Sequence, residues 1–236
     1  MLLLGLDFET TGLEPKTHHI IEVGVVTWDT DTQTPLRLLS FYVKAPTWVA
    51  EAEKIHGIKQ ETVEKYGVAP AAAFARLSKE LDGCEYIVAH NGNIFDKLFA
   101  EEECRRQGIK FWPQPWLDTT IDIEYPPHIT ASRKLVHLAA EHGFLNPFAH
   151  RAVFDVLTMF KVLSCYDINE VVRYSKVPWV TLQALVGFNN NKLAKDRSYR
   201  WNPDRKIWWR SVKTDKLEQE RKDAPFETKI IETVVQ

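Results

Sequence analysis

The chain has 236 residues, of which 44% are hydrophobic and 26% charged, and this suits one medium domain with a packed core plus a small appendage. Its formal net charge of −2 is unevenly spread, because residues 1 to 165 hold 16 Lys and Arg against 22 Asp and Glu, whereas residues 166 to 236 hold 14 against 10. The isolated Cys84, Cys104 and Cys165 exclude a disulfide framework and a zinc ribbon, and Asp7 and Glu9 interrupt the apolar N-terminus too early for a signal peptide or membrane span, so we expect a cytoplasmic protein without a membrane partner.

The first predicted elements are strands. Residues 2 to 8 are apolar without alternation, which predicts a strand buried on both faces of a sheet. Residues 19 to 28 and 36 to 43 predict two more strands that continue an antiparallel meander. From residue 50 the periodicity becomes helical, and Pro70 marks the start of a helix that runs to about Leu81.

Short strands and helices then alternate. A strand is expected at 86 to 89 and another at 116 to 118, and helices are expected near 94 to 107, 131 to 142 and 150 to 163. Strands followed by helices mixed with short strands predict an α/β fold with a mixed sheet over residues 1 to 165. A boundary near 165 to 177 then leads into a small β-rich module, residues 178 to 236.

The clearest element of this module is a hairpin, in which residues 198 to 201 pair with residues 206 to 211 across the turn Asn202-Pro203-Asp204-Arg205. Between residues 192 and 213 lie eight Lys or Arg against two Asp, interleaved with Tyr and Trp. Alternating aromatics on a hairpin are more often the core of a small sheet. Both patterns are compatible if the aromatics pack inward and a basic face meets nucleic acid, with Arg200, Arg205, Lys206 and Arg210 as the candidate contacts.

Two carboxylates end the first predicted strand. Asp7 and Glu9 are two residues apart, so both point to the same face of the strand, with Cα atoms about 6.5 Å apart. Such a pair can share a cation, although a lone pair more often marks a strand that emerges into solvent. Because this strand is so apolar, a carboxylate at its end needs a partner or a metal to offset desolvation.

Two further segments carry acids near strand and helix boundaries. Asp96 follows the predicted strand at 86 to 89 and begins a helix, where it could equally complement the helix dipole. His150 and Asp155 would face directions about 140° apart if both were helical, so we expect His150 on the loop that enters the helix and Asp155 on the helix. A lone histidine before a helix is more often a surface residue, and only the combination favours a functional site.

Together these segments resemble the three exonuclease motifs of the DnaQ-like DEDDh exonucleases, and within that family the proofreading subunits of bacterial DNA polymerases. The resemblance covers residues 1 to 165 and includes three lesser segments, residues 20 to 24, 54 to 58 and 132 to 135. It implies a ribonuclease H-like fold. One departure concerns the second motif, in which the stretch from His90 to Asp96 is one residue longer than the shortest family form, so a longer loop is expected before Asp96.

The resemblance implies that Asp7, Glu9, Asp96 and Asp155 bind two Mg²⁺ or Mn²⁺ ions and that His150 is the general base. Hard divalent cations do prefer carboxylate oxygens, and a paired-ion site can stabilise both the attacking and the leaving oxygen of a displacement at phosphorus. The resemblance also implies substrate contacts, which are expected at Thr10, Thr11, Glu51, His56 and Asn91.

We therefore expect a 3′-to-5′ exonuclease that hydrolyses single-stranded DNA ends to nucleoside 5′-monophosphates, with a replication or repair protein as a possible partner. Two alternatives stay open. The first is an RNA-trimming exonuclease of the same fold, because no residue visibly reads a 2′-hydroxyl. The second is a non-catalytic adaptor that binds nucleic acid.

Overall fold

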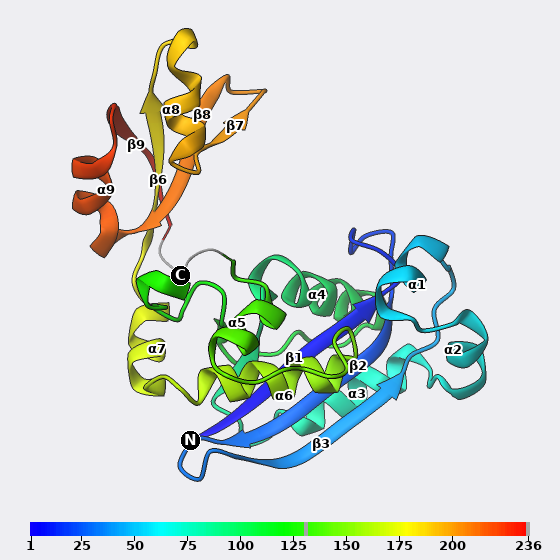
Figure 1. Cartoon of the computed structure of the whole chain (residues 1–236). Coiled ribbons are helices and arrows are strands. Elements are labelled where there is room, and N and C mark those ends of the chain that lie inside the picture. The colour runs from blue at the N-terminus through cyan, green and yellow to red at the C-terminus, as the bar shows by residue number, and fades with distance from the viewer. Residues whose placement is uncertain (130–131, 235–236) are drawn as a thin grey trace. The chain divides into compact units, whose positions relative to one another are not determined.

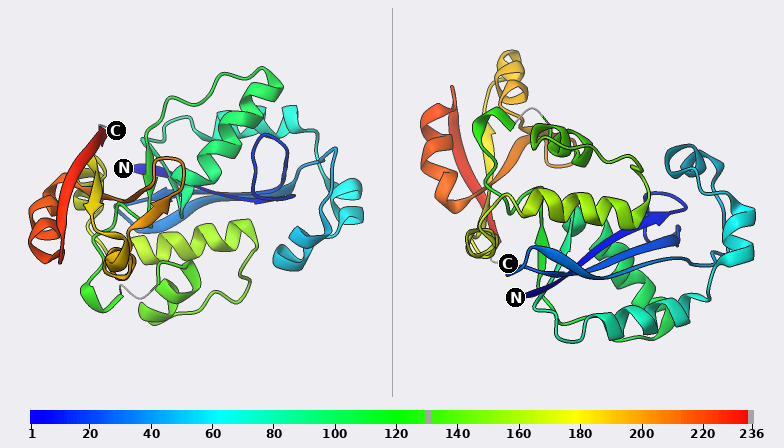
Figure 2. Two further views of the ribbon diagram at one scale, coloured as in Figure 1. Left: turned by 90° about the horizontal axis from the view of Figure 1, so that it is seen from above. Right: turned by 60° about the horizontal axis from the view of Figure 1, so that its bottom comes forward.

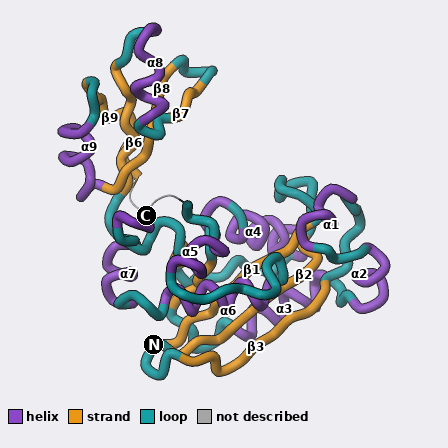
Figure 3. The backbone as a smooth tube through the Cα atoms, viewed as in Figure 1, coloured by secondary structure: helices purple, strands orange, loops and turns teal. Residues whose placement is uncertain are grey.

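The computed structural model describes residues 1 to 129 and 132 to 234, and the chain is drawn in Figures 1 and 3. It divides into two compact units, Met1–Ser175 and Lys176–Gln236. The strands are β1 (Leu2–Thr10), β2 (Ile20–Asp29), β3 (Thr34–Tyr42), β4 (Tyr86–Ala89), β5 (Trp116–Asp118), β6 (Trp179–Leu185), β7 (Arg200–Asn202), β8 (Ile207–Lys213) and β9 (Glu227–Val234). The helices are α1 (Ala50–His56), α2 (Gln60–Tyr66), α3 (Pro70–Glu80), α4 (Asp96–Gln107), α5 (Leu135–Glu141), α6 (Ala152–Leu163), α7 (Ile168–Ser175), α8 (Asn191–Asp196) and α9 (Leu217–Asp223), with short 3₁₀ turns η1 (Gly92–Ile94), η2 (Pro127–Ile129), η3 (Phe188–Asn190) and η4 (Thr214–Lys216).

The first unit is built on a mixed sheet with strand order β3-β2-β1-β4-β5. Strands β1, β2 and β3 form the expected antiparallel meander, and β4 and β5 add to the other side of β1 in parallel. Helices α3 and α4 cover one face of the sheet and α6 covers the other, as both views in Figure 2 show. The sheet and its helices confirm the predicted α/β fold.

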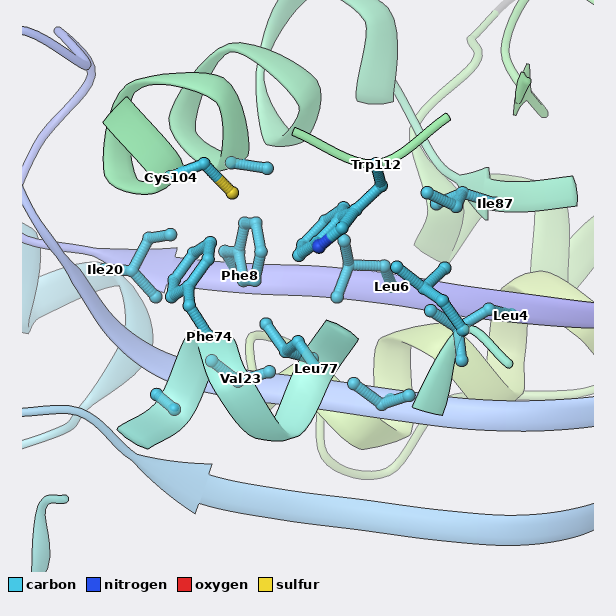
Figure 4. Packing of buried hydrophobic residues seen from close by; sticks show 14 of the residues in the cluster. Leu4, Leu6, Phe8, Ile20, Val23, Phe74, Leu77, Ile87, Cys104 and Trp112 are labelled. Atoms are coloured by element: carbon cyan, nitrogen blue, oxygen red, sulfur yellow. The ribbon is translucent and has the colours of Figure 1, made fainter. Parts of the chain in front are cut away.

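Strand β1 sends alternate side chains into two separate cores. Leu4, Leu6 and Phe8 pack with Phe74 of α3 and other side chains in one cluster, drawn in Figure 4. Leu3 lies in a second cluster on the opposite face with side chains of α6. Burial on both faces explains why the sequence of β1 is an uninterrupted apolar run. Asp7 and Glu9 lie four and six residues after Leu3, so their side chains point to the same face as Leu3, the face covered by α6.

Two glycines allow α6 to approach this face closely. A Cβ atom on Gly5 would lie 2.2 Å from the ring of Phe160, and one on Gly24 would lie 2.2 Å from the backbone nitrogen of Val153. Gly24 pairs with Asp7 across β1 and β2. The first turn of α6 therefore rests on the backbone of β2 directly beside Asp7.

The second unit is an antiparallel sheet with strand order β7-β8-β6-β9. Its own core contains Leu182, Tyr199 and Val212 and also includes Ala194 of α8. The predicted hairpin is present as β7 and β8, with Trp201 opposite Trp208. The burial of Tyr199 agrees with the inward packing expected for part of the aromatic set.

Two helical segments differ from expectation. Helix α7 lies in the segment that the sequence analysis assigned to the boundary, and Val171 of α7 is buried in the α6-side core. The helix expected over 131 to 142 begins only at Leu135, and residue 131 lies outside the described residues. Arg133 is held before the helix because His90 Nε2 donates to its carbonyl at 2.7 Å and its guanidinium stacks 4.2 Å from the centroid of the Tyr125 ring.

Candidate active site

Carboxylates from β1, α4 and α6 meet at one end of β1. Asp7 and Glu9 project from the strand, whereas Asp96 is the first residue of α4 and is 1% exposed. The backbone N–H of Phe8 donates to Asp96 Oδ1 at 3.0 Å. Asp96 is therefore fixed against the strand at the residue between Asp7 and Glu9.

A further acid, Asp118, shapes the loop that delivers Asp96. Asn91 has φ 68°, in the left-handed region, and its N–H donates to Asp118 Oδ1 at 2.9 Å while the N–H of Asn93 donates to Asp118 Oδ2 at 3.1 Å. Asp118 ends β5 and is buried. No role was predicted for Asp118 from the sequence, although it ends a short predicted strand much as Asp7 and Glu9 end the first one.

The loop before α6 is held by an ion pair between a partly exposed arginine and a buried glutamate, which was not predicted from the sequence. Arg151 Nη2 lies 2.7 Å from Glu22 Oε1, and the N–H of Ala152 donates to Glu22 Oε2 at 3.2 Å. Glu22 is 1% exposed and lies on β2. Because Arg151 directly follows His150, this pair fixes the backbone from which the histidine projects.

His150 lies on the loop that enters α6, as predicted, and Asp155 lies in the first turn of the helix. His150 has φ 63°, which turns its N–H toward Asp155 Oδ2 at 2.8 Å. Asn146 Nδ2 donates to the other oxygen of Asp155 at 2.6 Å. Glu9, His150 and Asp155 each offer a ligand atom, and these atoms all lie within 4.8 Å of one another.

Burial, together with neighbouring acids, disfavours the ionisation of all four carboxylates. Burial, followed by repulsion from Asp96, Glu9 and Asp155, raises the pKa of Asp7 well above its ordinary value. Burial and repulsion from Asp155 raise the pKa of Glu9 to about 8. Burial raises the pKa of Asp96 to about 8 and that of Asp155 to about 6, against the opposing effect of the hydrogen bonds that they accept.

This donor set fits divalent cations. Hard carboxylate oxygens are the ligands that such ions prefer, and a cluster of buried acids with raised pKa values gains most from a positive charge that offsets their repulsion. Asp7, Asp155 and His150 line a cleft of about 770 Å³, together with His90, Asn91, Arg133 and Lys134 among others. The cleft has room for a nucleotide.

The other expected substrate contacts lie in different settings. His56 is buried at the end of α1, where burial lowers its pKa, and its Nε2 has no hydrogen-bond partner among the described residues. Asn91 lines the cleft, and Glu51 is exposed in the first turn of α1. The hydroxyl of Thr10 donates to the carbonyl of Gly12, and that of Thr11 accepts from the N–H of His19, so both are engaged within the turn after β1.

The basic candidates of the second unit divide into two groups. Arg200, Arg205 and Lys206 are exposed. Arg210 is partly buried instead, and its Nη1 donates to the buried Glu220 at 3.0 Å and to the carbonyl of Arg197. The Arg210 guanidinium therefore takes part in an internal ion pair, and its contact with nucleic acid stays a prediction.

Comparison with known proteins gives three kinds of likeness. The Exonuclease family model, RNase_T, matches residues 4–163. A PolC-type DNA polymerase III from Ureaplasma parvum is 28% identical over 163 residues, which are 66% of this chain and 11% of that protein. The 3′-5′ exonuclease DinG of Staphylococcus saprophyticus is 26% identical over 200 residues, 79% of this chain and 20% of that protein. The chain thus spans a fifth or less of the length of these two relatives.

Among solved structures, a zinc-bound complex of E. coli ExoI with single-stranded DNA has a TM-score of 0.65 at 19% identity, over 76% of this chain and 47% of that chain. The nuclease domain of 3′hExo, a DEDDh family member bound to rAMP, has a TM-score of 0.59 at 18% identity, over 70% of this chain and 90% of that chain. These likenesses confirm the expected ribonuclease H-like fold. Across residues 1–129 and 132–234, no helix has both the length and the apolar character to cross a membrane.

Proposed function

Because the chain belongs to the exonuclease family RNase_T, we propose that it removes nucleotides one at a time from the 3′ end of single-stranded DNA and releases nucleoside 5′-monophosphates. Family membership confirms the resemblance seen in the three motifs. The observation that carries the proposal is the grouping of four acids around His150. Asp7, His150 and Asp155 line one cleft, and a ligand atom of Glu9 lies within 4.8 Å of ligand atoms of His150 and Asp155. Asp96 is held against the same strand by the N–H of Phe8.

The carboxylates of Asp7, Glu9, Asp96 and Asp155 would hold two Mg²⁺ or Mn²⁺ ions. When bound, these ions supply charge stabilisation for the attacking and leaving oxygens of a displacement at phosphorus. The protein's contribution is rigidity, because the Asp96 carboxylate is tied to the backbone of β1 and Asp155 to the backbone of His150. Oxygens held in this way need little rearrangement when the phosphodiester enters.

His150 is the proposed general base. Its ring is exposed at the cleft, and one ring nitrogen lies within 4.8 Å of oxygens of Glu9 and Asp155. An imidazole nitrogen would take a proton from the water that attacks phosphorus. The bond from phosphorus to the 3′ oxygen of the preceding nucleotide then breaks, that oxygen is protonated, and the terminal nucleotide leaves as a 5′-monophosphate.

The choice of DNA is supported by one of the relatives, whose name is that of a DNA polymerase. The names of the structural neighbours point both ways, since ExoI was solved with single-stranded DNA and 3′hExo with rAMP. RNA trimming by the same residues is therefore the second candidate. A replication or repair protein would be the natural partner of a DNA exonuclease, and we propose that class of partner.

The test compares matched DNA and RNA oligomers of one sequence as substrates, with product analysis by chromatography. The proposal expects nucleoside 5′-monophosphates as the first products and faster hydrolysis of DNA. Faster hydrolysis of RNA would select the trimming function instead. Stable binding of both oligomers without any hydrolysis in Mg²⁺ or Mn²⁺ would favour the adaptor.

A further inference from the structure

A second cleft, of about 720 Å³, lies entirely within the second unit. Its walls come from the end of β6, the start of α8 and the β7–β8 hairpin, and they include Trp201, Trp208, Asn191, Gln183 and Lys206. Neither the hydrolytic site nor the packing of the small core accounts for it.

The cleft presents an aromatic pair of unequal burial. Trp201 and Trp208 face each other across β7 and β8, with ring centroids 5.7 Å apart and ring planes inclined by 54°. Trp208 packs against the core, and its indole N–H donates to Asn191 Oδ1 at 2.9 Å, which fixes the ring. Trp201 is 48% exposed. Packing therefore explains Trp208 but leaves much of the Trp201 indole open to solvent.

The surroundings of the aromatic pair are positively charged. Lys206 lines the cleft, and the exposed Arg200 and Arg205 flank the same hairpin. In contrast, Arg197 and Arg210 are neutralised by Glu220, to which they lie at 2.6 and 3.0 Å. Exposed cations thus lie on the same hairpin as the exposed indole, and Lys206 lies in the cleft itself, while Arg197 and Arg210 are paired within the unit.

From this combination we propose that the cleft binds a base of single-stranded nucleic acid, with Trp201 stacking on the base and Lys206 and Arg205 contacting the adjoining phosphates. An exposed aromatic surface beside free cations matches a strand that alternates flat bases with anionic phosphates. The proposal rests on the proposed function for the class of ligand, and it adds a binding point outside the hydrolytic site. Asn191 and Gln183 offer amide groups to the edge of the stacked base.

The test uses the full chain in EDTA, so that hydrolysis does not remove the ligand. Fluorescence anisotropy would compare a long single-stranded DNA oligomer with an abasic oligomer of equal length, which keeps the phosphates and lacks the bases. Trp201→Ala should weaken binding of the base-bearing oligomer by about 5- to 100-fold and leave the abasic oligomer unaffected. Trp201→Phe should keep most of the affinity, because a ring remains to stack.

The matched control is Leu193→Ala, which removes an apolar side chain of similar exposure from α8, outside the cleft. This variant should bind like the unaltered chain. Unchanged DNA affinity in Trp201→Ala, or an equal loss on both oligomers, would overturn the proposal, and the first result would leave a protein ligand as the occupant of the cleft. Hydrolysis of a dinucleotide, measured separately, reports on the proposed function alone, so the two ideas can fail independently.

The charge contribution has its own readout. Replacing both Arg205 and Lys206 by Gln should reduce the slope of log affinity against log salt by about 0.7 for each phosphate that the variant no longer neutralises. An unchanged slope would overturn the phosphate part of the proposal. The control is the replacement of both Lys222 and Lys229 by Gln. These two lysines are exposed residues of the same unit and do not line the cleft, so the slope should stay unaltered.

Discussion

At the scale of single residues, the raised pKa values determine how the site responds to pH. Glu9 and Asp96, with folded-state pKa values of about 8, bind protons more tightly in the folded than in the unfolded chain, where ordinary carboxyl values apply. At any pH between the ordinary and the folded-state pKa values, the folded state carries more protons than the unfolded chain does. In EDTA, the free energy of unfolding contributed by these groups therefore falls as pH rises from about 4 to about 8.

This linkage gives the first prediction. Mg²⁺ or Mn²⁺ should raise the unfolding temperature more at pH 8 than at pH 5, because the ions compete with protons for the same carboxylates at low pH. Thermal unfolding at both pH values, with EDTA and with each ion, measures the effect. An equal rise at the two pH values would contradict binding at this cluster, and Asp82→Asn, which alters an exposed acid, should behave like the unaltered chain.

The role of His150 in proton transfer should be separable by experiment from the role of the carboxylates in binding ions. His150→Ala should lower kcat by about 10²- to 10⁴-fold, the usual contribution of a general base, while divalent ions still raise the unfolding temperature. Single-turnover kinetics and thermal unfolding measure the two quantities. Loss of the ion-induced rise would show instead that the histidine is itself a ligand. His137→Ala, an exposed histidine on α5, is the control.

At the scale of elements, the position of α6 depends on a glycine. A Cβ atom on Gly24 would meet the backbone of Ala152 and Val153, which cannot move aside as a flexible side chain would. Gly24→Ala should therefore displace the first turn of α6, cost about 1–3 kcal/mol of stability, and lower activity by moving Asp155 and His150. Denaturant unfolding and steady-state kinetics measure both.

The control for this prediction is Gly187→Ala. Gly187 lies in the second unit, has φ −71° and has nothing within 4 Å of an added Cβ atom. It should leave both stability and activity unchanged. A Gly24→Ala variant of full stability and full activity would contradict the account of how α6 is positioned.

At the scale of elements, the sequence predicted the features that depend on local patterns. The apolar run of β1, the proline at the start of α3 and the acids at element ends were readable because each is a local pattern, and they led to the correct fold. Other roles could not be predicted because they depend on close approach between segments far apart in the chain. These are the roles of Gly24, of Asp118 and of the ion pair between Glu22 and Arg151. Helix α7 was readable too, because Ile168, Val171 and Val172 recur at helical spacing, although a boundary was expected in that segment.

At the scale of the whole molecule, the two units have separate cores. The clusters on either side of the large sheet draw only on residues before 176, and the cluster of the small sheet draws only on residues after it. Because each unit buries its own apolar side chains, residues 1 to 175 should fold without the rest.

The prediction at this scale concerns substrate length. A chain ending at Ser175 should hydrolyse a dinucleotide at the rate of the full chain and should bind long single strands more weakly, with a shallower salt dependence. Dinucleotide hydrolysis and binding titrations at several salt concentrations would measure this. Equal affinity of both chains for long strands would exclude the second unit from substrate binding.

The most direct test of the central claim is digestion of a 5′-labelled single-stranded DNA oligomer by the full chain and by Asp7→Asn, each in Mg²⁺, in Mn²⁺ and in EDTA. We expect a ladder that shortens from the 3′ end in either ion, no ladder in EDTA, and no ladder from Asp7→Asn although that variant stays folded. Undiminished cleavage by Asp7→Asn, or cleavage that persists in EDTA, would contradict the assignment of the carboxylate cluster as a metal-dependent hydrolytic site.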